Sequence, residues 1–195
     1  MSDPGWDDGR MKLLVAAVPV ELVAFPEEIP GFDRVVTGPG KLKATYALTR
    51  ALERGQYDEI VVVGTSGTVD PGLHGGVHEI AAAVQHDVWD GEHVVGQHVT
   101  LPARVETGRE GIVVATGDHF VDTAAGVDTV RSLGGSLIDM ETYAYIWVAQ
   151  QYDVPIRVVR CVSDDADEGA FASWDEAAAA CSAVLWDWFR AEFAI

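Results

Sequence analysis

The sequence is poor in basic residues and contains no long hydrophobic run. Its 195 residues include 13 Lys and Arg against 31 Asp and Glu, which gives a net charge of −18. Such a charge repels nucleic-acid phosphates and anionic lipids, so neither nucleic acid nor a membrane surface is an expected partner. The longest apolar runs are also far shorter than the ~20 residues that a membrane-spanning helix needs.

Cysteine is nearly absent as well. The two that occur, Cys161 and Cys181, both lie in apolar stretches. A disulfide framework is therefore excluded, and we expect two buried free thiols. Residues 1–10 are polar and contain no apolar signal-peptide core. We expect a flexible N-terminal segment over residues 1–10, a single domain over residues 11–195 and a cytoplasmic location.

Several common catalytic signatures are missing. The sequence has no Gly-Lys-Ser/Thr phosphate loop, no dinucleotide fingerprint, no Gly-x-Ser-x-Gly elbow and no His-Glu-x-x-His zinc helix. Five histidines occur close together, namely His74, His78, His86, His93 and His98. Their spacing matches no common zinc site, so we expect surface or loop positions for them. We therefore expect no metal and no organic cofactor.

Short apolar runs alternate with segments of helical periodicity. Strands are expected over residues 11–17, 35–37, 59–63, 77–84, 111–116, 136–140 and 156–162, and helices over 41–54, 125–133, 141–151 and 174–193. This alternation predicts an α/β fold of three layers, in which a mostly parallel or mixed central sheet is flanked by helices. Ligands of such sheets bind beyond the carboxyl ends of the strands, so residues that follow strands are the candidates for a site.

Three carboxylates follow predicted strands: Glu21, Glu141 and Asp164. Glu21 stands among apolar neighbours, and a partly desolvated carboxylate suits a general base that works near neutral pH. Each also has a structural interpretation, because Glu21 and Glu141 could complement a helix dipole and Asp164 could belong to a solvated acidic loop. Two glycine segments, Gly38–Gly40 and Gly64–Gly67, are expected to be turns that bring backbone close to a ligand.

Five ordered segments resemble the nucleoside phosphorylase/nucleosidase superfamily, and within it the 5′-methylthioadenosine/S-adenosylhomocysteine nucleosidases. The segments are 17–21 (AVPVE), 37–41 (TGPGK), 64–67 (GTSG), 116–121 (TGDHFV), and the pair 139–142 (DMET) with 160–164 (RCVSD). The last pair is the most specific, because its order, its spacing and the acids that follow Asp164 all match the family pattern. The resemblance covers roughly residues 11–190, with gaps.

The resemblance implies cleavage of the N-glycosidic bond of a purine nucleoside. Asp164 would protonate N7 of the base, Glu21 would activate the attacking water, and Glu141 would bind the ribose hydroxyls. The other substrate-binding residues would be Gly67, Phe120, Val121, Met140, Ser163 and Trp174. Among these, Phe120 would stack on the base, Val121 would offer backbone hydrogen bonds and Met140 would pack beneath the sugar. The resemblance also implies a homodimer.

Alternatives to a nucleosidase stay open. Phosphorylases of this superfamily bind phosphate with arginines near the glycine segments. Here Lys41 follows Gly40, and the sequence places no basic residue next to Gly64–Gly67, which favours water as the acceptor. The stretches after the first strand and after Asp87 are shorter than the family pattern. A purine nucleoside phosphorylase, a futalosine hydrolase-like enzyme and a non-catalytic nucleoside-binding protein therefore remain alternatives.

Overall fold

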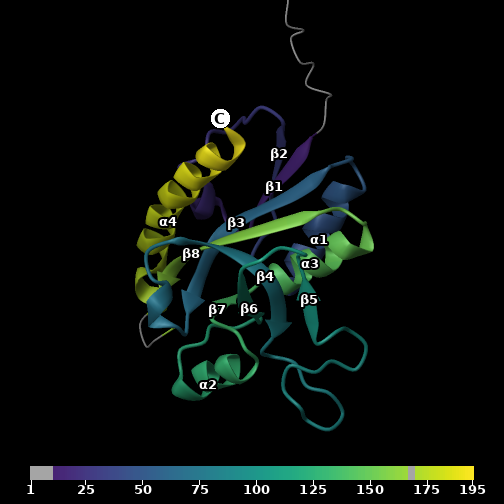
Figure 1. Cartoon of the computed structure of the whole chain (residues 1–195), viewed down its shortest axis with the longest axis vertical. Helices are drawn as coiled ribbons and strands as arrows, with labels where there is room; N and C mark the ends of the chain where they lie inside the picture. The colour runs from purple at the N-terminus through teal and green to yellow at the C-terminus, as the bar shows by residue number, and fades with distance from the viewer. Residues whose placement is uncertain (1–10, 167–169) are drawn as a thin grey trace, which may run out of the picture.

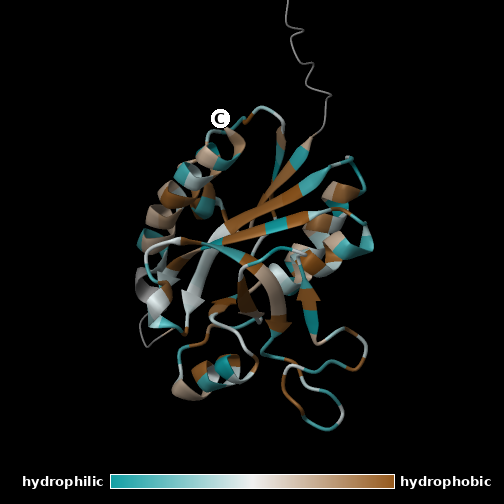
Figure 2. Cartoon of the chain, viewed as in Figure 1, coloured by the Kyte–Doolittle hydropathy of each residue, from teal (hydrophilic) through white to brown (hydrophobic). Residues whose placement is uncertain are grey.

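Buried strands form the centre of the molecule. The computed structural model describes residues 11–166 and 170–195, and the N-terminal segment expected over residues 1–10 lies outside them. The strands in the described part are β1 (Lys12–Ala16), β2 (Phe32–Val36), β3 (Glu59–Thr68), β4 (Val77–Gln85), β5 (Arg104–Glu106), β6 (Ile112–Thr116), β7 (Leu137–Asp139) and β8 (Ile156–Asp164). Hydrophobic residues are concentrated in these central strands, while the connecting loops are mainly hydrophilic (Figure 2).

Four α-helices and two short 3-10 helices accompany the strands in the part of the chain that the structure describes. They are α1 (Lys41–Leu52), α2 (Ala124–Ser132), α3 (Thr142–Gln151), α4 (Ala170–Phe193), η1 (Pro19–Leu22) and η2 (Pro71–Leu73). Within the described residues, none of these helices combines the length and hydropathy that crossing a bilayer requires. α1 and α3 lie on one side of the sheet and α4 on the other, with α2 beyond the ends of β6 and β7 (Figure 1).

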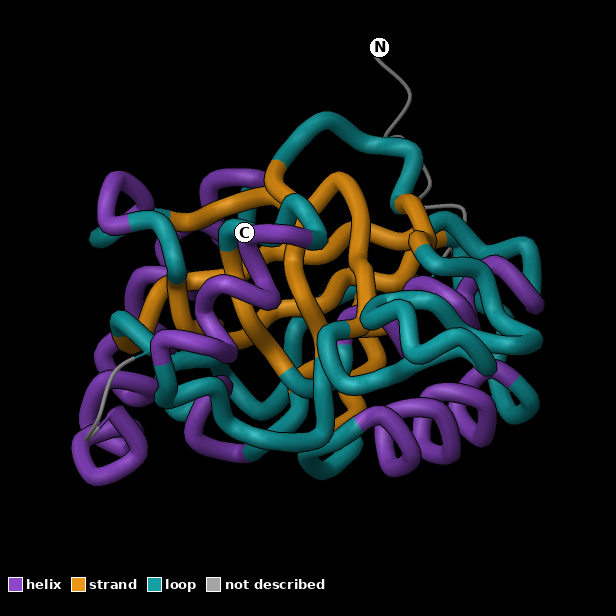
Figure 3. The backbone as a smooth tube through the Cα atoms, turned by 90° about the horizontal axis from the view of Figure 1, so that it is seen from below, coloured by secondary structure: helices purple, strands orange, loops and turns teal. Residues whose placement is uncertain are grey.

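The sheet is mixed, and part of it closes on itself. β2, β1, β3 and β8 run parallel to one another in that order. β8 pairs antiparallel with β4, β4 pairs parallel with β6, β6 pairs parallel with β7, and β7 returns antiparallel to β3. The strands β3, β8, β4, β6 and β7 therefore form a closed ring, which helices and loops surround (Figure 3). The expected α/β fold with a mixed sheet between helices is confirmed.

Two hydrophobic clusters hold the helices against the sheet. On one side, Leu48 of α1 and Ile146 of α3 pack against strand residues such as Val62 and Val158. On the other side, α4 contributes Leu185 and Phe189, and the ring of Phe189 lies among aromatic side chains of the chain's first and last segments. Cys161 and Cys181 are buried and free in this second region, as expected.

The structure corrects the sequence prediction at three places. Residues Gly64–Gly67 are not a turn but the continuation of β3, because β8 pairs with them along their length. β2 begins at Phe32 rather than near Val35. β5 was not predicted, since its three residues contain one apolar side chain and are held as a strand by pairing with β4. The segment Gly38–Gly40 is a turn, with positive φ angles of 85° and 96° at its two glycines.

Candidate active site

A cavity of about 330 Å³ lies at the carboxyl ends of the strands. Its lining comes from segments after β1, β2 and β6, from the ends of β3, β7 and β8, and from α4. All nine residues predicted for the site line it: Glu21, Gly67, Phe120, Val121, Met140, Glu141, Ser163, Asp164 and Trp174. The fold therefore brings together side chains that are separated by more than a hundred positions in the sequence.

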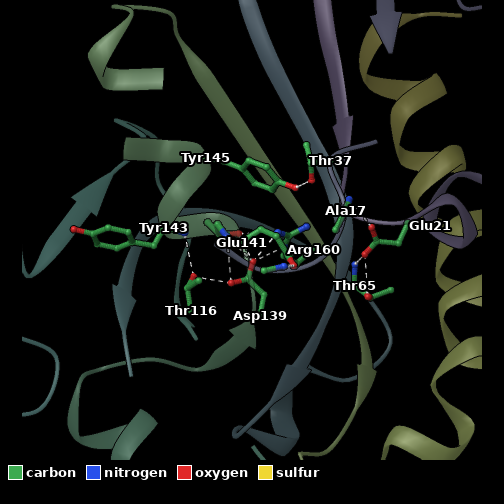
Figure 4. Close-up of polar contacts among 12 residues, drawn as sticks. Ala17, Glu21, Thr37, Thr65, Thr116, Asp139, Glu141, Tyr143, Tyr145 and Arg160 are labelled. Atoms are coloured by element: carbon green, nitrogen blue, oxygen red, sulfur yellow. Dashed lines mark hydrogen bonds and ion pairs between the residues drawn. The ribbon is translucent and has the colours of Figure 1, made fainter. Parts of the chain in front are cut away.

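The Glu21 side chain is held by backbone amides just before η1 and by Thr65 of β3. Pro19 begins η1, and the Glu21 carboxylate, on a residue only 3% exposed, turns back to the end of β1. Its Oε2 accepts hydrogen bonds from the amides of Ala17 (2.9 Å) and Val18 (3.2 Å). Its Oε1 accepts from the amide of Thr65 (2.7 Å) and from the Thr65 hydroxyl (3.0 Å) (Figure 4). Four donors thus occupy the two carboxylate oxygens of Glu21, and only the Thr65 hydroxyl can rotate away to admit another partner.

Arg160 and Asp139 form a buried ion pair, which is located between the side chains of Glu21 and Glu141. Arg160 of β8 is 1% exposed and donates from Nη2 (2.6 Å) and Nε (3.2 Å) to Oδ2 of Asp139, the last residue of β7. Thr116 donates to the other carboxylate oxygen of Asp139 (2.6 Å), and Arg160 also reaches the hydroxyl of Thr142 (2.7 Å) (Figure 4). The pair fixes the point at which β7 gives way to α3. It thereby sets the position of Met140 and Glu141, which follow directly.

The approach of Arg160 depends on a glycine. β3 and β8 pair Gly64 with Arg160, and a Cβ at Gly64 would stand 2.2 Å from Arg160 Nη1 and 2.8 Å from Glu21 Oε1. The sequence-based statement that no basic residue neighbours Gly64–Gly67 is therefore wrong in space. The arginine comes from another strand, and its charge is balanced chiefly by the carboxylate of Asp139, with Glu21 nearby.

Glu141 is buried and carries the most perturbed carboxyl group of the site. Its Oε1 accepts a hydrogen bond of 2.7 Å from the amide of Gly40, in the turn that precedes α1. Burial raises the pKa of Glu141 to about 8, with the charge of Asp139 and a smaller contribution from Glu21 acting in the same direction and Arg160 and the Gly40 amide opposing them. A glutamic acid that keeps its proton at neutral pH can donate a hydrogen bond to a ribose hydroxyl as well as accept one.

Asp164 is the last residue of β8. It pairs with Gly67 of β3, and both residues line the cavity. Its Oδ2 accepts from the hydroxyl of Ser163 (2.8 Å) and its Oδ1 from the amide of Ala166 (3.1 Å). A Cβ at Gly67 would lie 2.8 Å from Asp164 Oδ1, so the missing side chain leaves room for the carboxylate. Asp164 thus has a defined orientation at the cavity while remaining only partly buried.

The remaining predicted residues surround these acids. Val121 is buried and Phe120 is 36% exposed in the segment after β6, while Trp174 of α4 is partly buried on the α4 side of the cavity. His119 also lines the cavity, which the sequence did not single out. Asp167, one of the acids that follow Asp164, lies outside the described residues.

The prediction of surface or loop positions is wrong for His78, a partly buried residue of strand β4, whereas His86 lies in the loop after β4 but is buried there. His86 is 5% exposed, and its ring meets that of His119 edge to face with centroids 4.9 Å apart. Burial lowers the pKa of His86, against the opposing charge of Asp87. Among residues 11–166 and 170–195, no group of three or more His, Cys, Asp or Glu side chains is arranged to hold a metal ion.

Comparisons with known proteins identify the family of this chain. Residues 97–187 match the model of the Phosphorylase superfamily. The 5′-methylthioadenosine/S-adenosylhomocysteine nucleosidase of Anoxybacillus flavithermus is 31% identical over 163 residues, covering 72% of this chain and 70% of that protein. The chain belongs to the nucleoside phosphorylase/nucleosidase superfamily, in its methylthioadenosine/adenosylhomocysteine nucleosidase-like branch. The family expected from the sequence motifs is thus confirmed.

Solved structures show the same nucleosidase-like fold. The Helicobacter pylori 5′-methylthioadenosine/S-adenosylhomocysteine nucleosidase, in complex with a substituted pyrrolidine ligand, superposes with a TM-score of 0.82 at 20% identity, covering 93% of this chain and 97% of that one. The native futalosine hydrolase of Helicobacter pylori also gives 0.82, at 21% identity, covering 90% of this chain and 94% of that one. At sequence identities this low, these two similarities show the fold alone.

Sequence reasoning gave no role to Thr65, Asp139 or Thr116, which hold the predicted residues in place. One signal was available for Asp139. Arg160 stands between apolar residues of a predicted buried strand, and a buried arginine needs a buried acidic partner. The partner's identity was not evident, because it depends on which strand end approaches β8.

The raised pKa of Glu141 predicts a pH-dependent cost to stability. In the unfolded chain the pKa of Glu141 has its ordinary value of 4.5, whereas in the folded protein it is raised to about 8. Between these values the folded state binds more protons, so the contribution of Glu141 to the free energy of unfolding falls as pH rises. Glu141→Gln lacks this titration. Its stability relative to wild type should therefore increase by at least about 1 kcal/mol between pH 5 and pH 9.

Urea unfolding of both proteins at pH 5, 7 and 9 measures this difference. The exposed Glu110 provides a matched control, since Glu110→Gln should give a difference from wild type that does not change with pH. A difference for Glu141→Gln that is equally constant would contradict the raised pKa.

Proposed function

We propose that this chain hydrolyses the N-glycosidic bond of a purine nucleoside of the methylthioadenosine/adenosylhomocysteine kind. The observation that carries the proposal is that Glu21, Glu141 and Asp164 line one cavity of about 330 Å³. That volume lies in the range of small-ligand pockets. Family membership supports the same reaction, since the Anoxybacillus relative is named for both nucleosides.

Asp164 would act on the leaving base. As the C1′–N9 bond breaks, its electron pair flows into the purine ring, and a proton delivered by Asp164 to N7 leaves the departing base neutral. The ribose becomes a cation of oxocarbenium character. Among the described residues that line the cavity, Glu21, Asp139, Glu141 and Asp164 are acidic and none is Lys or Arg. This arrangement favours a transition state in which positive charge develops on the sugar.

Glu21 would orient and activate the water. The water oxygen forms the new bond to C1′ and one of its protons passes to the Glu21 carboxylate. Rotation of the Thr65 hydroxyl would free an acceptor position on Oε1 for that water. Glu141, held by the Gly40 amide, would bind the ribose hydroxyls.

The basic residues near the cavity favour water over phosphate as the acceptor. Arg160 is fully buried and is committed to Asp139. Lys41 is committed to Asp87 (2.5 Å) and Gln85 (2.9 Å). A phosphate dianion would have to displace one of these carboxylates or lie among the acids that line the cavity. The same charges disfavour an anionic substituent at the 5′ position, which supports a neutral thioether.

A substrate panel tests the reaction. Methylthioadenosine, adenosylhomocysteine, adenosine, inosine, futalosine and adenosine 5′-phosphate are incubated with the protein without phosphate, and released base is measured by chromatography. We expect base release from the thioether nucleosides and much less from the nucleotide. Release that depends on added phosphate and yields ribose 1-phosphate would identify a phosphorylase, and tight binding without any product would identify a binding protein.

Asp164→Asn tests the proposed acid. The amide keeps the shape of the side chain but cannot deliver a proton, so turnover should fall by roughly 10²–10⁴-fold while binding persists. Turnover and the dissociation constant for methylthioadenosine are measured with Asp153→Asn as a control, because Asp153 is exposed and does not line the cavity. Wild-type turnover in Asp164→Asn would remove Asp164 from this role.

A homodimer is part of the proposal. Leu42 and Tyr46 are 82% and 67% exposed and stand one turn apart on α1, which makes a small apolar stripe on a strongly acidic protein. A second copy of the chain would cover this stripe. A cytoplasmic location fits the two free thiols of Cys161 and Cys181.

Sedimentation velocity tests the assembly. The wild-type chain should sediment as a dimer, and Leu42→Glu should shift it toward a monomer because it places a charge in the contact. Val184→Glu is the control, since Val184 is 43% exposed on α4, on the opposite side of the sheet. A wild-type monomer, or a Leu42→Glu variant that dimerises like the control, would disprove the α1 interface.

A further inference from the structure

The ammonium group of Lys41 connects three segments at the rim of the cavity. Lys41 is the first residue of α1, and its side chain is only 17% exposed. Its Nζ donates to Asp87 Oδ1 (2.5 Å) and Gln85 Oε1 (2.9 Å), at and just after the end of β4. It also lies 3.9 Å from Asp118 Oδ2, in the segment after β6.

Backbone hydrogen bonds complete this connection. Asp118 Oδ1 accepts from the Lys41 amide (2.8 Å), and Asp87 Oδ2 accepts from the Asp118 amide (2.7 Å). Burial alone would raise the pKa of Asp87, but the hydrogen bonds from Lys41 and Asp118 lower it below its ordinary value. Asp87 is therefore a charged partner at neutral pH. We call the set of Lys41, Asp87 and Asp118 the Lys41 bridge.

Two of the three segments that the bridge joins contribute to the proposed site, namely the start of α1 and the segment after β6. The amide of Gly40, immediately before Lys41, donates to Glu141. Phe120 and Val121, two and three residues after Asp118, line the cavity. A shift of α1 relative to the segment after β6 would therefore move the ribose-binding and the base-binding groups apart.

We propose that Lys41 is a positioning residue for nucleoside binding, which acts through the bridge on Glu141 and on the segment that carries Phe120. This inference rests on the proposed function. Glu21 and Asp164, which would carry out the chemical step, are held by contacts outside the bridge. The amide of Thr65 in β3 donates to Glu21, and the amide of Ala166 donates to Asp164. Loss of the bridge should therefore weaken binding more than turnover.

Kinetics of Lys41→Met against Lys43→Met test the proposal. Both substitutions remove a lysine charge from the first turn of α1, but Lys43 is exposed. The lost contacts are charge-assisted hydrogen bonds, so KM for methylthioadenosine should rise about tenfold or more in Lys41→Met, with kcat changed by less than about threefold. Lys43→Met should keep both wild-type values.

A double-mutant cycle guards against a variant that misfolds around an unpaired Asp87. Asp87→Asn and Lys41→Met/Asp87→Asn are compared with the single lysine variant, since the double variant leaves no unpaired charge. Because both substitutions break the same contact, their effects on KM should not add. Additive effects, or a folded Lys41→Met or double variant with the KM of the Lys43→Met control, would overturn the proposal.

Hydrogen exchange gives a second readout that requires no activity. Peptides covering residues 38–42 and 117–121 contain the amides of Gly40, Lys41 and Asp118, and they should exchange faster in Lys41→Met than in Lys43→Met. Unchanged exchange overturns the bridge. If the wild-type enzyme releases no base from any nucleoside, the proposed function fails, while the exchange result still decides whether Lys41 orders these two segments.

Discussion

The site depends on the neutralisation of one buried guanidinium. Arg160 lies between the buried apolar residues Val159 and Cys161 of β8, and its charge could not remain there without a carboxylate partner. Asp139 accepts two hydrogen bonds from Arg160 at one carboxylate oxygen, and Glu21 is close enough to contribute. The ends of β7 and β8, the start of α3 and the start of η1 are thereby held in one arrangement. The cavity is the space that this arrangement leaves open.

One arginine lies among three acidic residues, and not all of them are ionised at neutral pH. Burial, together with the charge of Asp139, raises the pKa of Glu141 to about 8, so Glu141 keeps its proton at neutral pH. The remaining acids leave the cavity suited to a cationic transition state and unsuited to a phosphate dianion. The same residues that complete the fold at the strand ends thus also favour hydrolysis over phosphorolysis.

Glycines make this concentration of charged groups possible. At Gly64 a side chain would collide with Arg160 and Glu21, and at Gly67 it would reach Asp164. Gly38 and Gly40 play a different part, because their positive φ angles let the chain turn so that the Gly40 amide meets Glu141. Backbone therefore approaches the proposed reacting groups from two sides, by close strand packing on one and by a tight turn on the other.

The local patterns of the sequence determined the order and type of the main elements. Apolar runs marked seven of the eight described strands and periodic segments the four α-helices, because strand burial and helix amphipathicity are written in consecutive residues. The rule that ligands bind at strand ends, together with the family motifs, named nine residues that the fold gathers around one cavity. Their catalytic and binding roles remain proposals.

Only the tertiary structure decided how those residues are held and what surrounds them. The pairing of Gly64 with Arg160 and the meeting of Asp139 with that arginine depend on strand register between distant segments. So do the burial of His86 and the contact of Lys41 with Asp87. A sequence pattern reports the neighbours of a residue along the chain. The pKa of Glu141 and the partner of Lys41 depend on neighbours in space, and the closure of β3, β8, β4, β6 and β7 into a ring creates those neighbours.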